Sequence, residues 1–370
     1  MSEIRVGVIG AGSWTEICHI PGVQAHPAGR VVALCSRSRE RREAQAAKLG
    51  ISVTYGDYRE LIADPKIDAV TISTPNAEHF PIAKAALQAG KHVFCEKPLT
   101  LRAAESAELL AHAQAHGLVH QVAFTFRFLY AAHEARRLVT SGALGRLQHV
   151  RAFVEGGGAL RPEAPARWRD DAERSGYGML GDMGSHMIDL VRFVTAEELV
   201  RIRGAQWRIG RGDRPDPDRP GALRAVTADE EVEALGDLAG GAGFTLRVSK
   251  LMPPPHRNYL DFIGDEAYLR LRYSRGDVDV FSLGRGGAEP EPQPLPDGAA
   301  PERNHCLFKM MGTFVDACLG QSRPAPCDRP ADFADGWAVQ EALDAVAQSA
   351  ASGAPVALPT GEVPRPLRPE

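Results

Sequence analysis

The sequence predicts an α/β protein in which a doubly wound, parallel-sheet domain is followed by an α+β domain with a large, mostly antiparallel, open sheet. Two observations predict this order. Through the first third of the 370 residues, short apolar runs alternate with helical stretches, as in βαβ units. Beyond about residue 125, strand-like runs succeed one another with few helices between them. We expect a first domain over residues 1–124, a second over 125–362 and a flexible tail over 363–370.

The elements of the first domain follow from its apolar runs. Buried parallel strands are near-continuous apolar segments, and we expect them at Arg5–Ile9, Val31–Leu34, Ala69–Ser73, Val93–Cys95 and Val119–Ala123. Helices are expected at Arg39–Leu49, Ala77–Ala89 and Arg102–Ala115. Thr100 lies just before the last of these helices, and we expect it to act as the N-cap.

The second domain contains strand-like segments and two irregular stretches. Strands are expected at Leu147–Val154, Ala242–Lys250, Tyr259–Ile263, Ala267–Tyr273 and Val278–Leu283. Residues 211–220 hold three prolines among alternating charges, so we expect no regular element there. Residues 284–301 are rich in Gly and Pro and are expected to form a long connection.

Composition excludes several classes of protein. The formal net charge of -4 argues against a general nucleic-acid-binding protein, which usually has a basic excess. No run approaches the roughly 18 apolar residues that span a bilayer, and the first strand begins by residue 5, which leaves no room for a signal peptide. We expect a cytoplasmic protein whose six cysteines, at 18, 35, 95, 306, 318 and 327, are reduced thiols without a C-x-x-C pattern.

A glycine-rich turn follows the first predicted strand. The residues from Gly10 to Thr15 open a helical stretch, which is the strand–turn–helix order of a dinucleotide-binding loop. Gly10 permits the tight turn, and Gly12 lets the backbone approach a pyrophosphate at the helix N-terminus. Thr15 replaces the third glycine of G-x-G-x-x-G, so we expect looser packing there. Many glycine-rich turns bind nothing, but this placement favours a nucleotide.

A lysine stands at the end of another predicted strand. The apolar run from His92 to Cys95 leads into Glu96-Lys97-Pro98. In doubly wound sheets, ligands bind outside the carboxyl ends of the strands, so Lys97 is placed to contact a cofactor or polarise a carbonyl. The alternative is a surface lysine in a loop.

A carboxylate and an imidazole share one later segment. Asp182 and His186 are four residues apart, and in a helix they would share a face. A carboxylate that orients an imidazole suits proton transfer near neutral pH. Alternatively, Asp182 is a helix N-cap and His186 a core histidine.

Together these segments resemble the glucose–fructose oxidoreductase/inositol dehydrogenase (Gfo/Idh/MocA) family of NAD(P)-dependent oxidoreductases. The resemblance extends to Ser73-Thr74-Pro75-Asn76 with His79, to Phe126-Arg127-Phe128, to Trp168-Arg169 and to the late helix around Asp335–Ala350. It implies a Rossmann-type first domain, a carbohydrate-like substrate, and a homodimer or homotetramer formed through the open sheet face. Together with the net charge and the short apolar runs, it predicts no membrane or nucleic-acid partner.

The resemblance also implies catalytic roles. His186 would exchange the hydroxyl proton, Lys97 would stabilise the reacting oxygen, and Asp182 would orient His186 or a substrate hydroxyl. Cofactor contacts are expected from Gly10, Gly12, Ser13, Trp14, Ser36, Arg37, Arg41, Thr74, Asn76, His79, Glu96, Lys97, Trp168 and Arg169, although plain packing is an alternative for Trp168. We expect no metal, because Asp182 and His186 supply too few ligands for a catalytic zinc site.

The second predicted strand bears on cofactor preference. NAD-binding folds usually end this strand in a carboxylate that binds the ribose hydroxyls, whereas Ser36 stands there in this chain. Arg37 and Arg41 flank Ser36, and guanidinium groups suit phosphate oxygens. We therefore expect NADP(H), with NAD(H) less favoured. Alternatively, the arginines form a solvated helical turn and specificity is loose.

Three other functions stay open at this point. A reductase of a non-sugar carbonyl or diol would keep the cofactor loop and Lys97. A glycosidase with a transient redox step would hold NAD tightly. A cofactor-sensing binding protein would not need Lys97, Asp182 and His186 together.

Overall fold

A computed structural model describes residues 3–161, 163–210, 212–273, 278–285, 291–292, 303–321 and 329–359. These residues form two compact units. The first unit comprises residues 3–128 with the later segments 303–321 and 329–337, and the second comprises the described parts of 129–292 with 338–359. The expected division at residue 124 leaves out this return of the chain to the first unit. The expected tail over 363–370 lies outside the described residues.

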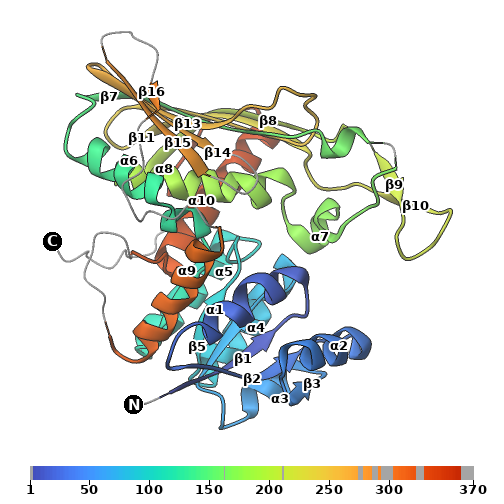
Figure 1. Cartoon of the computed structure of the whole chain (residues 1–370). Coiled ribbons are helices and arrows are strands. Elements are labelled where there is room, and N and C mark those ends of the chain that lie inside the picture. The colour runs from blue at the N-terminus through green and yellow to red at the C-terminus, as the bar shows by residue number, and fades with distance from the viewer. Residues whose placement is uncertain are drawn as a thin grey trace. The chain divides into compact units, whose positions relative to one another are not determined.

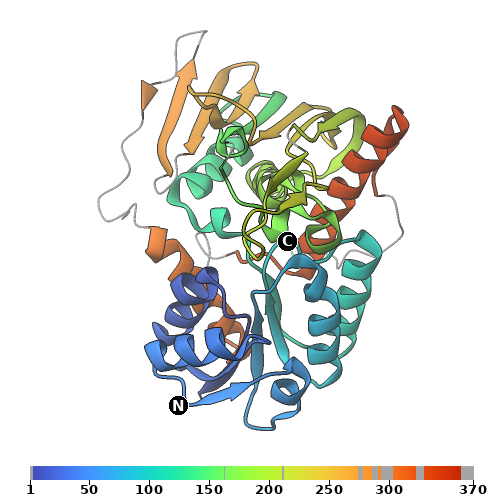
Figure 2. The ribbon, with the colours of Figure 1, turned by 90° about the vertical axis from the view of Figure 1, so that its right-hand side faces the viewer.

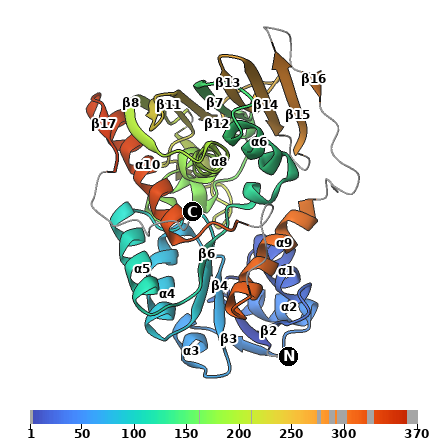
Figure 3. The same cartoon turned by 90° about the vertical axis from the view of Figure 1, so that its left-hand side faces the viewer.

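The first unit is built on a six-stranded parallel sheet in the order β3-β2-β1-β4-β5-β6. The strands are β1 (Ile4–Ile9), β2 (Gly29–Cys35), β3 (Val53–Tyr55), β4 (Ala69–Ile72), β5 (His92–Cys95) and β6 (His120–Val122). Figure 3 shows α4 and α5 on one face and α1, α2 and α9 on the other, and Figure 2 shows the same layers from the opposite side. The predicted doubly wound parallel sheet is confirmed, and its strand order reverses between β1 and β4.

The helical segments of the first unit agree with the predicted ones where those exist. They are the π-helical η1 (Thr15–His19), α1 (Ile20–Gln24), α2 (Arg39–Leu49), α3 (Tyr58–Ala63), η2 (Asn76–Glu78), α4 (His79–Gln88), α5 (Ala103–Ala115), η3 (Thr125–Phe128) and α9 (Arg303–Cys318). The predicted cap at Thr100 is wrong, because Arg102 is the N-cap of α5. The Thr100 hydroxyl instead lies 2.7 Å from both the Arg102 carbonyl oxygen and the Ser106 hydroxyl.

Burial explains why α9 joins the first unit. Leu307, Met310, Met311, Phe314 and Val315 of this helix are at most 2% exposed. Burying one such side chain contributes about 1.5–3 kcal/mol, and α9 packs against α1. The aromatic ring of Phe314 also meets Phe94 of β5, with ring centroids 5.6 Å apart. The apolar face of α9 thus completes the core beneath the parallel sheet.

The second unit contains a nine-stranded sheet in the order β16-β15-β14-β13-β7-β12-β11-β8-β17. Its strands are β7 (Leu147–Glu155), β8 (Leu199–Arg208), β11 (Glu231–Leu238), β12 (Gly243–Ser249), β13 (Asn258–Gly264), β14 (Ala267–Tyr273), β15 (Val278–Arg285), β16 (Glu291–Pro292) and β17 (Val356–Ala357). All neighbouring pairs are antiparallel except β7 and β12. The predicted mostly antiparallel sheet is confirmed.

Helices cover one face of this sheet (Figure 1). They are α6 (Tyr130–Thr140), α8 (Ser185–Thr195) and α10 (Phe333–Ser352). The second unit also holds the short segments η4 (Gly158–Leu160), η5 (Trp168–Asp170), α7 (Ala172–Ser175) and η6 (Leu180–Gly184). Among the described helices, none is long and apolar enough to cross a membrane. The five cysteines within the described residues are free thiols, and Cys327 lies outside those residues.

The prediction of no regular element over residues 211–220 is partly wrong. The strand β9 (Asp213–Pro215) pairs with β10 (Leu223–Ala225) in a two-stranded antiparallel sheet. The buried carboxylate of Asp216 closes the turn between them, because it accepts hydrogen bonds from the Arg219 side chain at 3.0 Å and the Arg224 side chain at 2.7 Å. Most of residues 284–301 lie outside the described part of the chain.

Candidate active site

The glycine-rich turn after β1 depends on a close approach at Gly10 and on a buried hydrogen bond from Thr15. Gly10 has φ +117°, and a Cβ atom there would lie 2.2 Å from the Ser73 carbonyl oxygen at the end of β4. Only glycine fits such a position. The third position of the motif is not loose, contrary to expectation: Thr15 is fully buried and its hydroxyl donates to the Gly10 carbonyl oxygen at 2.9 Å. Gly12 has open space where a Cβ would stand, and Ser13 is exposed.

Helix α2 supports the glycine-rich turn and the loop after β2 through two residues that the sequence patterns did not indicate. The Gln45 side-chain amide donates to the Gly12 carbonyl oxygen at 3.2 Å. The Arg42 guanidinium donates to the Ser36 carbonyl oxygen at 2.6 Å. Their i, i+3 spacing places both on one face of α2, and this spacing is the only local signal that was present.

Of the residues expected to select the cofactor, Ser36 and Arg37 lie between β2 and α2, and Arg41 lies in the first turn of α2. Ser36 follows β2 and is half-buried, and the Ser38 hydroxyl caps α2 by accepting from the Arg41 backbone N–H at 3.3 Å. Arg41 itself is exposed. Arg37 is also exposed, and its guanidinium lies 3.2 Å from the carboxylate of Glu78 in η2. Arg37 therefore reaches across to the loop after β4.

Glu96 links β5 to the first helix. Its Oε1 atom accepts a hydrogen bond from the Trp14 indole N–H at 2.6 Å and lies 3.1 Å from His19 Nε2. Burial alone raises the pKa of the Glu96 carboxyl, but the hydrogen bond and charge of His19, together with the charge of Lys97, outweigh burial and hold that pKa below its usual range. An ionised, doubly held Glu96 therefore fixes the backbone position from which Lys97 projects.

His79 joins the loops that follow β4 and β5. Its Nδ1 atom lies 2.9 Å from the Pro98 carbonyl oxygen and its Nε2 atom 3.1 Å from the Thr74 carbonyl oxygen. The ring is 1% exposed, and burial lowers the pKa of the imidazole. Asn76, in the loop after β4, is also buried. His79 therefore connects the loop after β4 with the loop after β5.

The segment that carries Asp182 and His186 begins as a π-helix. Asp182 lies in η6 and His186 is the second residue of α8, where it is 7% exposed. The Asp182 carboxylate is 3.3 Å from Nε of Arg169, whose guanidinium stacks 4.3 Å from the centroid of the Trp168 ring. π-Helical segments are rare, and they are often found at functional sites. Of the two here, η1 directly follows Ser13 and Trp14, whereas η6 contains Asp182 and precedes His186.

A short segment before β11 frames this part of the second unit. The Asp229 carboxylate accepts hydrogen bonds from the Gly178 N–H at 2.6 Å and the Leu180 N–H at 2.8 Å. Burial raises the pKa of this carboxyl against the lowering effect of the two hydrogen bonds. The neighbouring Thr227 and Ala228 N–H groups both donate to the Asp170 carbonyl oxygen, at 2.8 and 3.1 Å. The same segment therefore fixes the turn carrying Arg169 and the start of η6.

Asp170 is anchored in turn by the end of β12. Lys250 Nζ lies 2.5 Å from Oδ1 of Asp170, and Oδ2 accepts from the Arg167 N–H at 2.8 Å. These contacts, with the charge of Arg214, hold the pKa of the Asp170 carboxyl below its usual range although burial raises it. Lys250 and Asp229 carry no motif that the sequence analysis could have recognised.

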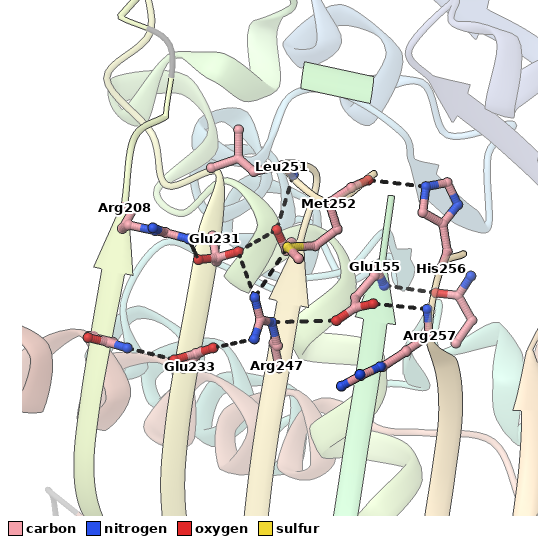
Figure 4. A network of polar contacts seen from close by, with 12 residues as sticks. Glu155, Arg208, Glu231, Glu233, Arg247, Leu251, Met252, His256 and Arg257 are labelled. Carbon is pink, nitrogen blue, oxygen red and sulfur yellow. Dashed lines mark hydrogen bonds and ion pairs between the residues drawn. The ribbon is translucent and has the colours of Figure 1, made fainter. Parts of the chain in front are cut away.

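The chain after β12 is held by a polar network (Figure 4). Arg247 lies 3.5 Å from the Glu155 carboxylate, 3.3 Å from that of Glu231 and 2.7 Å from that of Glu233. The sulfur of Met252 accepts from Arg247 at 3.2 Å, and Glu155 accepts from the Arg257 N–H at 3.0 Å. The network ties residues 252–257 to the ends of β7 and β12, the parallel pair.

Comparison with known proteins identifies the family. Residues 4–124 match the family model described as an oxidoreductase family with an NAD-binding Rossmann fold, and residues 132–270 match the GFO/IDH/MocA C-terminal domain. The chain belongs to the GFO/IDH/MocA family. It is therefore an NAD(P)-dependent oxidoreductase, with a Rossmann-type first domain as predicted.

Several named relatives of this GFO/IDH/MocA protein have names that specify sugar-like compounds, and one, from Mus musculus, is named trans-1,2-dihydrobenzene-1,2-diol dehydrogenase. Levoglucosan dehydrogenase from Pseudarthrobacter phenanthrenivorans is 32% identical over 85% of this chain and 72% of its own length. The 1,5-anhydro-D-fructose reductase of Ensifer adhaerens is 33% identical over 56% of this chain and 61% of its own. A solved structure of levoglucosan dehydrogenase with NADH and L-sorbose has a TM-score of 0.84 and 26% identity, covering 97% of this chain and 100% of that one.

The structure places the predicted residues of this GFO/IDH/MocA protein in two groups. The first unit brings together Gly10, Gly12, Trp14, Glu96 and Lys97 at the carboxyl ends of β1 and β5, and the second brings together Trp168, Arg169 and Asp182. Within the described residues, no group of three His, Cys, Asp or Glu side chains could hold a metal ion.

Asp229 offers a direct test of the frame in the second unit. We expect Asp229→Asn to lower kcat about tenfold to a hundredfold, because an amide can accept only one of the two N–H bonds and small misplacements of catalytic groups are costly. Cofactor affinity should change little. Asp237→Asn is the matched control, since Asp237 of β11 pairs with Arg203 at 3.3 Å. Steady-state kinetics on both variants decides: an unaltered kcat for Asp229→Asn contradicts the positioning role.

Proposed function

We propose that the protein transfers hydride between NADP(H) and a hydroxyl or keto group of a sugar, a sugar derivative or a polyol. The observation that carries this proposal is Lys97 at the carboxyl end of β5, preceded by a Glu96 that is bonded to both Trp14 and His19. A cation fixed at that end of a parallel strand is suited to a cofactor and an oxygen of its substrate. The named relatives support a carbohydrate-like substrate.

Each proposed catalytic residue has one task. When bound, the nicotinamide cofactor accepts or supplies the hydride. His186 removes the hydroxyl proton in the oxidative direction and returns it in the reductive direction, as a general base and acid. Lys97 donates a hydrogen bond to the reacting oxygen and stabilises its negative charge. Asp182 orients His186 or a substrate hydroxyl, and its ion pair with Arg169 keeps the carboxylate in place.

The residues present fit a dinucleotide. The glycine turn leaves open space at Gly12 and presents the start of the first helix, where backbone N–H groups favour a pyrophosphate. Gly10, Gly12, Ser13 and Trp14 would hold that group, and Thr74 and Asn76 would border it from the loop after β4. We assign Glu96 and His79 to positioning these loops.

The cofactor preference is proposed to be NADP(H) over NAD(H). Ser36 replaces the carboxylate that would repel a 2′-phosphate, and Arg37 and Arg41 are exposed beside it. Calorimetry of the unmodified protein should give tighter binding of NADPH than of NADH. Arg37→Ala or Ser36→Asp should reduce or invert the difference. Equal or tighter binding of NADH by the unmodified protein refutes this preference. The alternative is a preference for NADH, which is bound in the structure of levoglucosan dehydrogenase.

A substrate panel tests the reaction itself. Sugars, keto-sugars and inositols should be offered with both cofactors, and absorbance followed at the reduced-nicotinamide band. We expect turnover with at least one sugar or polyol, and we expect it to survive a strong chelator because no metal takes part. Turnover only with non-sugar carbonyls or diols would contradict the proposed substrate class. Activity that a chelator removes and zinc restores would contradict the absence of a metal. Sugar hydrolysis without net absorbance change would contradict net hydride transfer. The last outcome indicates a transient-redox glycosidase.

We also propose a homodimer or homotetramer formed through the sheet of the second unit. Figure 1 shows α6, α8 and α10 on one face of that sheet only. The side chains on the other face include Leu235, which is 49% exposed. Sedimentation equilibrium should give a mass at least twice that of the 39.9 kDa chain.

A further inference from the structure

The ion pair between Arg37 and Glu78 spans the nucleotide-binding edge of the first unit. Arg37 follows β2, and Glu78 ends η2, which follows β4. In the sheet, β2 and β4 are the two neighbours of β1, whose carboxyl end leads into the Gly10–Gly12 turn. The pair therefore joins the loops on either side of that turn. A dinucleotide bound at this switch point must pass these two side chains.

The two partners differ in how firmly they are held. Glu78 precedes His79, whose buried ring is within hydrogen-bond distance of two carbonyl oxygens, and the Glu78 N–H donates to the Pro75 carbonyl oxygen at 2.9 Å. Its side chain is only 34% exposed. Arg37 projects from a turn and its side chain is 78% exposed. Exposed pairs of this kind contribute little to stability, so a ligand can separate them while the carboxylate stays in place.

We propose that Glu78 is a specificity-determining residue that supplies, from the loop after β4, the carboxylate missing from the end of β2. A carboxylate there accepts hydrogen bonds from ribose hydroxyls and repels a 2′-phosphate. Arg37 acts in the opposite sense, because its guanidinium attracts the phosphate. The cofactor preference is then the balance of Arg37 and Arg41 against Glu78. This inference rests on the proposed function, since it concerns the same nucleotide site.

The repulsion has a measurable size. At a screened protein surface, Coulomb's law gives a neighbouring carboxylate an effect of roughly threefold to tenfold on the affinity for a phosphate dianion. Glu78→Gln keeps the size of the side chain and removes its charge. It should therefore tighten NADPH binding about threefold to tenfold and leave NADH binding unchanged or weaker. The gain should shrink as salt is added, because screening weakens the repulsion.

Calorimetry with NADPH and NADH on the full chain tests this proposal. The matched control is Glu43→Gln, because Glu43 is also a carboxylate paired with an arginine, Arg39, at 2.7 Å on α2. We expect no change in either affinity for that variant. An unchanged NADPH affinity in Glu78→Gln shows a surface pair without a role in specificity and overturns the proposal. A weaker NADPH affinity shows that Glu78 instead orients Arg37 toward the phosphate, and this also overturns it.

A double-mutant cycle separates the two residues. If Glu78 repels the phosphate directly, Glu78→Gln should still improve NADPH binding in an Arg37→Ala background. A gain that disappears in that background shows that Glu78 only sequesters Arg37, and contradicts direct repulsion. The proposed preference and the role of Glu78 are tested by different results. Tighter binding of NADH than of NADPH by the unmodified protein refutes the preference. The difference in NADPH affinity between the unmodified protein and Glu78→Gln decides the role of Glu78.

Discussion

Replacing His186 with alanine is expected to lower kcat by about a hundredfold or more, the usual contribution of a general acid–base group. His186 is the second residue of α8 and is 7% exposed. If it exchanges the substrate's proton, its loss removes a transition-state interaction, so kcat should fall while cofactor affinity changes far less. Stopped-flow or steady-state kinetics with a true substrate, together with calorimetry for the cofactor, measures both quantities.

Lys97→Ala should lower kcat to a similar extent because the reacting oxygen loses its cation. Lys91 provides the matched control at the opposite end of the same strand. Its ammonium group donates to the Ile67 and Asp64 carbonyl oxygens at 2.6 and 3.1 Å. We therefore expect Lys91 to stabilise the start of β5 and to take no part in the reaction. Lys91→Ala should keep its kcat. Near-normal turnover in Lys97→Ala or His186→Ala would remove that residue from the mechanism.

Local patterns identified the residues whose role depends on position in one element. Gly10 could be predicted because a turn directly after a Val/Ile strand needs a residue with unusual φ, and the structure gives it φ +117°. The placement of Lys97 could be predicted because a parallel strand delivers the residues after it to one edge of the sheet. Both inferences need only the nearest ten residues or so of sequence, together with general rules of α/β topology.

The supporting residues could not be predicted because their partners are remote in sequence. His19 reaches Glu96 across 77 residues, and Gln45 reaches the glycine turn across 33. Asp229 holds the N–H groups of residues 51 and 49 positions earlier. A lone buried His, Gln or Asp has no periodicity of its own, and only the packed fold shows which backbone group it meets.

The strands β8 and β11 are absent from the list of expected strands for a different reason, and for β8 only the alternation of Arg201 and Arg203 indicates strand register and a solvated sheet face. β8 carries arginines at 201, 203 and 208, and β11 begins at the end of the acidic run Asp229-Glu230-Glu231, so neither shows a continuous apolar run. Their charges are satisfied across strands, as in the pairs of Arg203 with Asp237 and Arg208 with Glu231. Cross-strand pairing of this kind stabilises a sheet, but it becomes visible only when the register is known.

Loss of one partner from the buried ion pair between Arg127 and Asp335 should strongly destabilise the first unit. Arg127 lies in η3 and Asp335 in the first turn of α10, both in the first unit, with Nη1 and Oδ2 2.8 Å apart. Their side chains are 3% and 10% exposed. Removing one partner leaves the other charge buried, which costs about 3–5 kcal/mol. We expect Arg127→Met to lower the free energy of unfolding by this amount, measured by urea denaturation.

The companion variant distinguishes charge from packing. Arg127→Met/Asp335→Leu removes both charges, so it should be less destabilised than the sum of the two single variants, because no buried charge remains uncompensated. Arg39→Met is the control: its pair with Glu43 is also an arginine–carboxylate contact, at 2.7 Å, but the Arg39 side chain is 80% exposed. That variant should change the free energy of unfolding by about 1 kcal/mol or less. If Arg127→Met lowers the free energy of unfolding no more than Arg39→Met does, the Arg127–Asp335 pair does not fix η3 to the start of α10. The return of the chain to the first unit must then depend on the apolar packing of α9 alone.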